Sequence, residues 1–107
     1  MKKIIYFLMF MLLFLSQPVL SADNNYYEQG RKAYAEGDYK LAQRYFWAVI
    51  NNSPENLNAR YYLAHSLAKQ QKYDDAAVEY QRIIQTSPNS TTGKYAKESL
   101  NRISPYL

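Results

Sequence analysis

The chain has 107 residues, 48% of them hydrophobic, and no cysteine, so it can form one small domain without any disulfide. Its formal net charge of +4 includes Lys2 and Lys3, which belong to an N-terminal segment with the features of an export signal. Without that segment, 11 Lys and Arg face 9 Asp and Glu, and so small a positive excess argues against a nucleic-acid partner.

The N-terminal segment has the layout of a secretory signal peptide. Lys2 and Lys3 precede an unbroken apolar run from Ile4 to Leu15, and the small residues Ser21 and Ala22 offer cleavage sites. The run is short for a membrane span, which needs about 20 residues. We therefore assign residues 1–22 to a signal peptide and expect a periplasmic protein. Secretion, or membrane anchoring by an uncleaved segment, is the alternative.

Two helices are expected first after this segment. The polar residues 23–25 can cap a helix that runs from about Tyr26 to Glu36. Gly37 then ends it, because a left-handed backbone costs glycine little, and Asp38 can N-cap the next helix. That second helix carries apolar side chains at spacings of three and four, which form one face. They are Tyr39, Ala42, Phe46, Val49 and Ile50.

Three more helices follow. The second helix ends at residues 51–54, and a third begins near Leu57. Gln71-Lys72 then occupies a turn with weaker signals than Gly37-Asp38, and a fourth helix starts at Tyr73. The last helix, from Ser90 to Ser104, has a single apolar stripe, which is typical of a terminal cap. The stripe consists of Ala96, Leu100 and Ile103.

Five positions recur at a spacing of 34 residues. Tyr39, Ala42, Phe46, Ile50 and Pro54 return as Tyr73, Ala76, Tyr80, Ile84 and Pro88. This period, with an Ala-x-x-x-aromatic core and a closing proline, resembles the tetratricopeptide repeat family. The resemblance implies an all-α, short right-handed solenoid. Its parts would be helix–turn–helix repeats at 23–56 and 57–90 and a C-terminal capping helix at 91–107.

The family pattern also implies where the helices of a repeat touch and where a partner binds. Small residues would stand at the helix contacts, namely Gly30, Ala42, Ala64 and Ala76. The first helix of each repeat would line a groove for a protein or peptide. That lining would consist of Asn24, Tyr27, Arg31, Tyr34, Asn58, Tyr61, Tyr62, His65, Lys69 and Tyr95, with Ser99 and Arg102 beside them.

The chemistry of this lining suggests the kind of partner. Tyrosine and arginine dominate binding hot spots. Arg31, Lys69 and Arg102 give a positive bias that only Glu28 opposes, so we expect a peptide of acidic or C-terminal carboxylate character. The carboxylate clamp known in this family is not reproduced, because Tyr27 and Arg31 stand where that clamp has Lys and Asn.

A second interface is indicated on the second helix. Trp47 aligns with Gln81 and Tyr45 with Glu79, so both aromatic residues are expected on the outward side. Such a pair would suit self-association into a homo-oligomer. A self-associating structural subunit is therefore one functional alternative. A membrane-tethered adaptor, which would keep the N-terminal segment uncleaved, is the other.

The residue set gives no basis for an enzyme. There is one histidine, His65, no cysteine, and no G-x-S-x-G or H-E-x-x-H motif, so the sequence carries no signature of a nucleophilic triad or a zinc site. Asp74 and Asp75 stand at a helix start, where carboxylates complement the helix dipole. We expect no catalytic residue, no metal and no cofactor.

Overall fold

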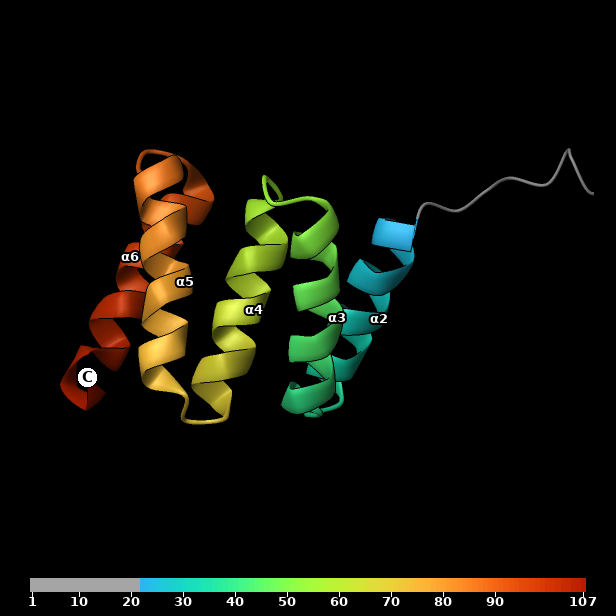
Figure 1. Cartoon of the computed structure of the whole chain (residues 1–107). Helices are drawn as coiled ribbons and strands as arrows, with labels where there is room; N and C mark the ends of the chain where they lie inside the picture. The colour runs from blue at the N-terminus through green and yellow to red at the C-terminus, as the bar shows by residue number, and fades with distance from the viewer. Residues whose placement is uncertain (1–21) are drawn as a thin grey trace, which may run out of the picture.

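The computed structural model describes residues 22–107, which form five α-helices and a short C-terminal 3₁₀ helix. The elements are α2 (Ala22–Ala35), α3 (Tyr39–Asn52), α4 (Leu57–Lys69), α5 (Tyr73–Thr86), α6 (Thr91–Ile103) and η1 (Ser104–Tyr106). Figure 1 shows the helices side by side in chain order, each antiparallel to the next. The prediction of an all-α solenoid is confirmed. The predicted signal segment, except Ala22, lies outside the described residues.

The first helix begins earlier than the sequence analysis predicted. α2 starts at Ala22 rather than near Tyr26, so residues 23–25 belong to the helix and do not cap it. Asn25 Oδ1 accepts a hydrogen bond from Gln29 Nε2 at 3.1 Å, one turn further along. The polar side chain therefore pairs along the helix surface. Among the helices of residues 22–107, none is both long enough and apolar enough to cross a membrane.

The turns inside the two repeats have the same hydrogen-bond pattern. In the first, the Asp38 N–H donates to the Ala33 carbonyl at 2.9 Å, and Gly37 takes a left-handed backbone with φ 81°. In the second, the Lys72 N–H donates to the Leu67 carbonyl at 2.9 Å. Here Gln71 takes the left-handed backbone, with φ 63°. Both are Schellman turns, so the two repeats share this backbone although only the first has the glycine.

Helix starts are capped at three of these elements. The Asp38 carboxylate accepts from the Leu41 N–H at 3.1 Å, as predicted, and Asn56 and Ser90 cap α4 and α6 in the same way. Lys72, at the start of α5, makes no side-chain cap bond. The N-terminus of α5 instead carries Asp74 and Asp75, which complement the helix dipole.

The predicted helix contacts form the core. Ala42, Ala64 and Ala76 are fully buried, and Gly30 is buried too. A Cβ atom on Gly30 would lie 2.9 Å from the Phe46 ring, so the ring occupies the space that a side chain would need. The prediction of small residues at the contacts is confirmed. At the far end, α6 packs against α5 and α4 through its buried Ala96 and Ile103.

Candidate functional site

The first helices of the two repeats and the cap helix share one face, which we call the groove face (α2, α4 and α6). A hollow of about 510 Å³ lies between them. Its lining consists of Tyr27, Tyr34, Asn58, Tyr61, Tyr62, His65, Thr91, Thr92 and Tyr95. All but the two threonines were predicted from the repeat register, so most of the predicted groove residues come together in space.

The tyrosines of the groove face are packed on one another. Tyr62 stacks on Phe46 with ring centroids 5.0 Å apart, and Tyr27 meets both rings edge-on at 5.8 and 6.1 Å. Tyr34 lies edge-on to Tyr62 at 5.7 Å. Burial raises the pKa of the Tyr27 and Tyr34 hydroxyls above the usual tyrosine value. These rings therefore complete the core while one edge of each faces the hollow. Tyr95 is the most accessible, at 52% exposed.

His65 lines both hollows and is partly buried. Its Nδ1 is 2.9 Å from the Tyr80 hydroxyl, and its ring meets Tyr61 edge-on at 4.2 Å. Burial, aided by the charges of Lys69 and Arg102, lowers the pKa of His65 to about 4. The ring is therefore neutral near pH 7, and Nδ1 can accept the hydrogen bond that the buried Tyr80 hydroxyl donates. Burial also raises the pKa of Tyr80, which keeps that hydroxyl protonated.

A second hollow of about 400 Å³ continues the first toward the C-terminus. It shares Tyr34 and His65 with the first hollow and adds Lys69 and Arg102. Lys69 has no ion-pair partner within residues 22–107, whereas Arg102 lies 3.7 Å from Glu98. The expectation that only Glu28 opposes the groove cations was therefore wrong. An exposed pair of this kind is worth little, so this end of the groove stays positive.

Three other predicted residues contribute little to the lining of the larger hollow. Arg31 is exposed, 3.4 Å from Glu28, and borders a neighbouring hollow with Tyr62. Ser99 lines the second hollow but is 4% exposed, and its hydroxyl lies 3.4 Å from that of Tyr61, so it contacts Tyr61 and offers little surface to a ligand. Asn24 lies in the first turn of α2.

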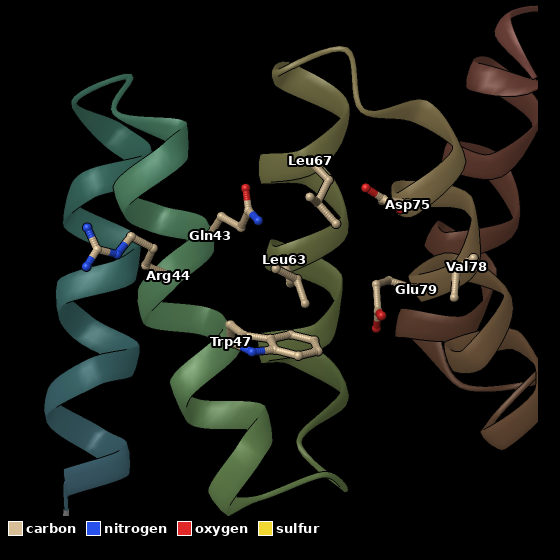
Figure 2. Close-up of a pocket in the computed structure, with 8 residues that line it drawn as sticks. All are labelled: Gln43, Arg44, Trp47, Leu63, Leu67, Asp75, Val78 and Glu79. Atoms are coloured by element: carbon tan, nitrogen blue, oxygen red, sulfur yellow. The ribbon is translucent and has the colours of Figure 1, made fainter.

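The predicted aromatic pair on α3 is divided between two sides of that helix. Tyr45 packs toward α2, with its ring 6.1 Å from Tyr26. Trp47 lines a separate groove of about 310 Å³ between α3 and α5, over Leu63 and Leu67 of α4 (Figure 2). Sequence alone placed the two rings in one patch, but side chains two positions apart on a helix point in different directions.

The structure contains a buried ion pair that the sequence pattern does not predict. Arg60 Nη1 donates to Glu79 Oε2 at 2.6 Å, and Arg60 Nη2 donates to the Pro54 carbonyl at 3.2 Å. Arg82 also approaches Glu79, at 3.4 Å. Tyr45 is predicted on the outside because it aligns with the carboxylate Glu79, yet Glu79 itself is only 6% exposed. The register aligns Arg60 with Tyr26 and Glu79 with Tyr45, but only the structure shows that these two positions are in contact.

These features define a helical-repeat domain whose first helices and cap helix share a hollowed face. Within residues 22–107 no group of three or more His, Asp or Glu is placed to hold a metal ion. A family model described as tetratricopeptide repeat matches residues 27–91, so the chain belongs to the tetratricopeptide repeat family. Repeats of this family are non-catalytic and mediate protein–protein interactions. No curated protein and no solved structure matches the chain.

Proposed function

We propose that the protein is an exported adaptor of the bacterial cell envelope that binds a peptide segment of a partner protein on the groove face. The observation that carries this proposal is the pair of connected hollows across α2, α4 and α6, which are joined at Tyr34 and His65. Several helices contribute to one continuous lining, which supports a binding site that the fold itself forms. Preformed sites lose less conformational entropy on binding.

The two hollows favour different parts of one ligand. The larger is aromatic and holds no charged residue among those that line it, so it suits apolar or aromatic side chains. The second offers Lys69 and Arg102, which suit a carboxylate. The ligand we propose is an extended segment with apolar side chains followed by an acidic side chain or the chain's own C-terminal carboxylate.

The test is a selection of random peptides displayed with free C-termini, followed by titration of the selected peptides. Tyr95→Ala is the best probe of the larger hollow, because this exposed ring can be removed with little effect on the fold. We expect it to weaken binding about tenfold, the size of a moderate hot spot. Lys69→Glu should weaken it further, and amidation of the peptide C-terminus should mimic Lys69→Glu if the terminal carboxylate is recognised.

The matched control is Trp47→Ala, which removes an exposed aromatic ring from the opposite face. Equal affinity for wild type and Tyr95→Ala, together with loss in Trp47→Ala, would move the peptide site to that face and end this proposal. Circular dichroism of each variant separates lost binding from lost folding.

Export rests on the N-terminal pattern. Cleavage after Ser21 or Ala22 would leave α2 almost whole, because that helix starts at Ala22. Mass spectrometry of the protein recovered from envelope fractions should give a chain that begins at Ala22 or Asp23. A chain that retains residues 1–21 would instead support the membrane-tethered adaptor.

A further inference from the structure

The groove on the opposite face has an apolar floor and exposed apolar rims. Leu63 and Leu67 of α4 form the floor, and Trp47 of α3 and Val78 of α5 stand on the two sides (Figure 2). Trp47 is 49% exposed and Val78 is 44% exposed. Two large apolar side chains thus face solvent beside one narrow groove, which is typical of a surface that another protein covers.

The two walls of this groove carry opposite charges. Arg44 of α3 and Asp75 of α5 line the groove. α3 also carries Lys40 one turn before Arg44 and has no acidic residue, and α5 carries Asp74 beside Asp75. All four side chains are exposed, and within residues 22–107 none of them takes part in a salt bridge. The remaining acid of the groove, Glu79, is already held by Arg60 and Arg82. Within the lining, Arg44 therefore favours a negative group of an occupant and Asp75 a positive one.

The repeat register places these charged residues at corresponding positions along the two parallel helices α3 and α5. The spacing of 34 residues aligns Lys40 with Asp74 and Arg44 with Val78, and α3 and α5 run in the same direction (Figure 1). Asp75 precedes Val78 by three residues, which is about 4.5 Å along a helix. An arginine side chain can cover that distance.

We propose that this groove is the two-fold interface of a homodimer, with a second copy of the chain as its occupant. A two-fold axis along the groove places α3 of one copy opposite α5 of the other. Lys40 then faces Asp74, Arg44 reaches Asp75, and the Trp47 ring meets the apolar floor of the partner. The same contacts occur twice, as an isologous interface requires. A peptide with charges of one sign would be attracted by the charges of only one of the two helices.

The dimer is expected to be weak, because two short helices per copy offer less than the roughly 800 Å² per partner of a stable interface. It leaves the groove face free, so it is independent of the peptide site proposed above. One adaptor dimer would then present two peptide sites, which raises avidity for a repetitive partner.

The test uses charge reversal in the protein purified after export of the full chain. In wild type, sedimentation velocity up to about 1 mM should show a monomer–dimer equilibrium, as expected for a small interface. Trp47 is the single tryptophan, so its emission should shift to shorter wavelength as the protein concentration rises. Arg44→Glu alone and Asp75→Lys alone should each remain monomeric, because positions 44 and 75 then face each other with like charges in both halves of the interface.

An equimolar mixture of these two variants should form the dimer again. In one half of the mixed interface the two substituted side chains face each other, a carboxylate opposite an ammonium group, and in the other half the native Arg44 faces the native Asp75. Both contacts are therefore attractive. Lys97→Glu, an exposed position on α6, is the control with a reversal of charge outside the groove and should sediment as wild type.

Three results would overturn the proposal. A wild type that is monomeric throughout would remove the dimer, and single variants that dimerise like wild type would remove the facing charges. Dimerisation of wild type without rescue in the mixture would show that the two-fold register is wrong.

Discussion

The two repeats fill one structural position with opposite chemistry. In the first repeat, Tyr26 and Tyr45 pack their rings 6.1 Å apart. In the second, the residues 34 positions later are Arg60 and Glu79, which form a buried ion pair at 2.6 Å. Both pairs join the first helix of a repeat to the second. The backbone arrangement therefore does not depend on one kind of side-chain contact, and only the cost of breaking the contact differs.

A similar exchange occurs nearer the groove. Phe46 of the first repeat corresponds to Tyr80 of the second, and Arg31 corresponds to His65. Phe46 has no hydroxyl and needs no hydrogen-bond partner, whereas the buried Tyr80 hydroxyl has one in His65 Nδ1 at 2.9 Å. The second repeat thus depends on matched polar pairs where the first depends on packing. It is the more vulnerable of the two, because a polar group that loses its buried partner is costly.

The largest effect is expected from breaking the ion pair on one side. Glu79→Ala should lower the free energy of unfolding by about 3–5 kcal/mol, because Arg60 would remain buried without its carboxylate. Urea unfolding followed by circular dichroism measures this loss. Tyr45→Ala is the matched change in the first repeat and should lower the free energy of unfolding by a smaller amount. Equal losses would show that the two pairs are energetically alike.

Replacing both residues of the ion pair tests whether this position requires charge. Arg60→Tyr/Glu79→Tyr installs the aromatic pair of the first repeat in the second, and should recover most of the stability that Glu79→Ala loses. A double variant as unstable as Glu79→Ala would mean that the position itself requires charge.

Overpacking the second helix contact is expected to cost about 1–3 kcal/mol. Ala76 is 0% exposed where α4 and α5 touch, so Ala76→Leu should push the two helices apart. Thermal unfolding would show it as a lower melting temperature. An unchanged melting temperature would argue against close contact at this position.

Substitutions at Gln71 and Gly37, the left-handed positions of the two turns, should change stability in opposite directions. Gln71→Gly should stabilise the second turn by about 1 kcal/mol, because Gln71 holds a left-handed backbone that strains a side-chain-bearing residue. Gly37→Ala should destabilise the first turn by about the same amount, since Gly37 has φ 81°. Equilibrium unfolding of both variants measures these changes in the free energy of unfolding. A loss of stability in Gln71→Gly would contradict the claim that the left-handed backbone strains Gln71.

Lowering the pH should reduce the stability of the second repeat, by less than any of the substitutions above. The pKa of His65 is about 4 in the fold, below the ordinary value of 6.5. The unfolded chain therefore binds the proton first, and stability falls as the pH drops from about 6.5 to 4 and then changes no further through this group. The effect is limited because the ring is partly exposed. Melting temperatures of wild type and His65→Gln across this pH range should diverge on the acid side, and parallel curves would exclude His65 as the cause.

Much of this fold was accessible from sequence because its signals are local. Gly37, Asp38 and the small residues Gly30 and Ala42 each act within a turn or a helix contact, and the period of 34 residues repeats them. The same register located most of the groove lining. It could not separate rings that remain accessible, such as Tyr95, from rings that complete the core.

The failures concern contacts that depend on a distant partner. A lone carboxylate is rarely buried, so the sequence predicts an exposed side chain for Glu79. Its burial depends on Arg60, 19 positions away on another helix. Trp47 and Tyr45 were joined because they are close in sequence, whereas their surroundings are set by α5 and α2.

The most direct test of the central claim is chemical-shift mapping of the labelled protein during titration with a selected peptide. Binding on the groove face should move the amide signals of α2, α4 and α6, including those of Asn58 and Tyr95, and should leave the signals around Trp47 and Val78 unchanged. Shifts concentrated on α3 and α5, with none at Tyr95, would contradict the account.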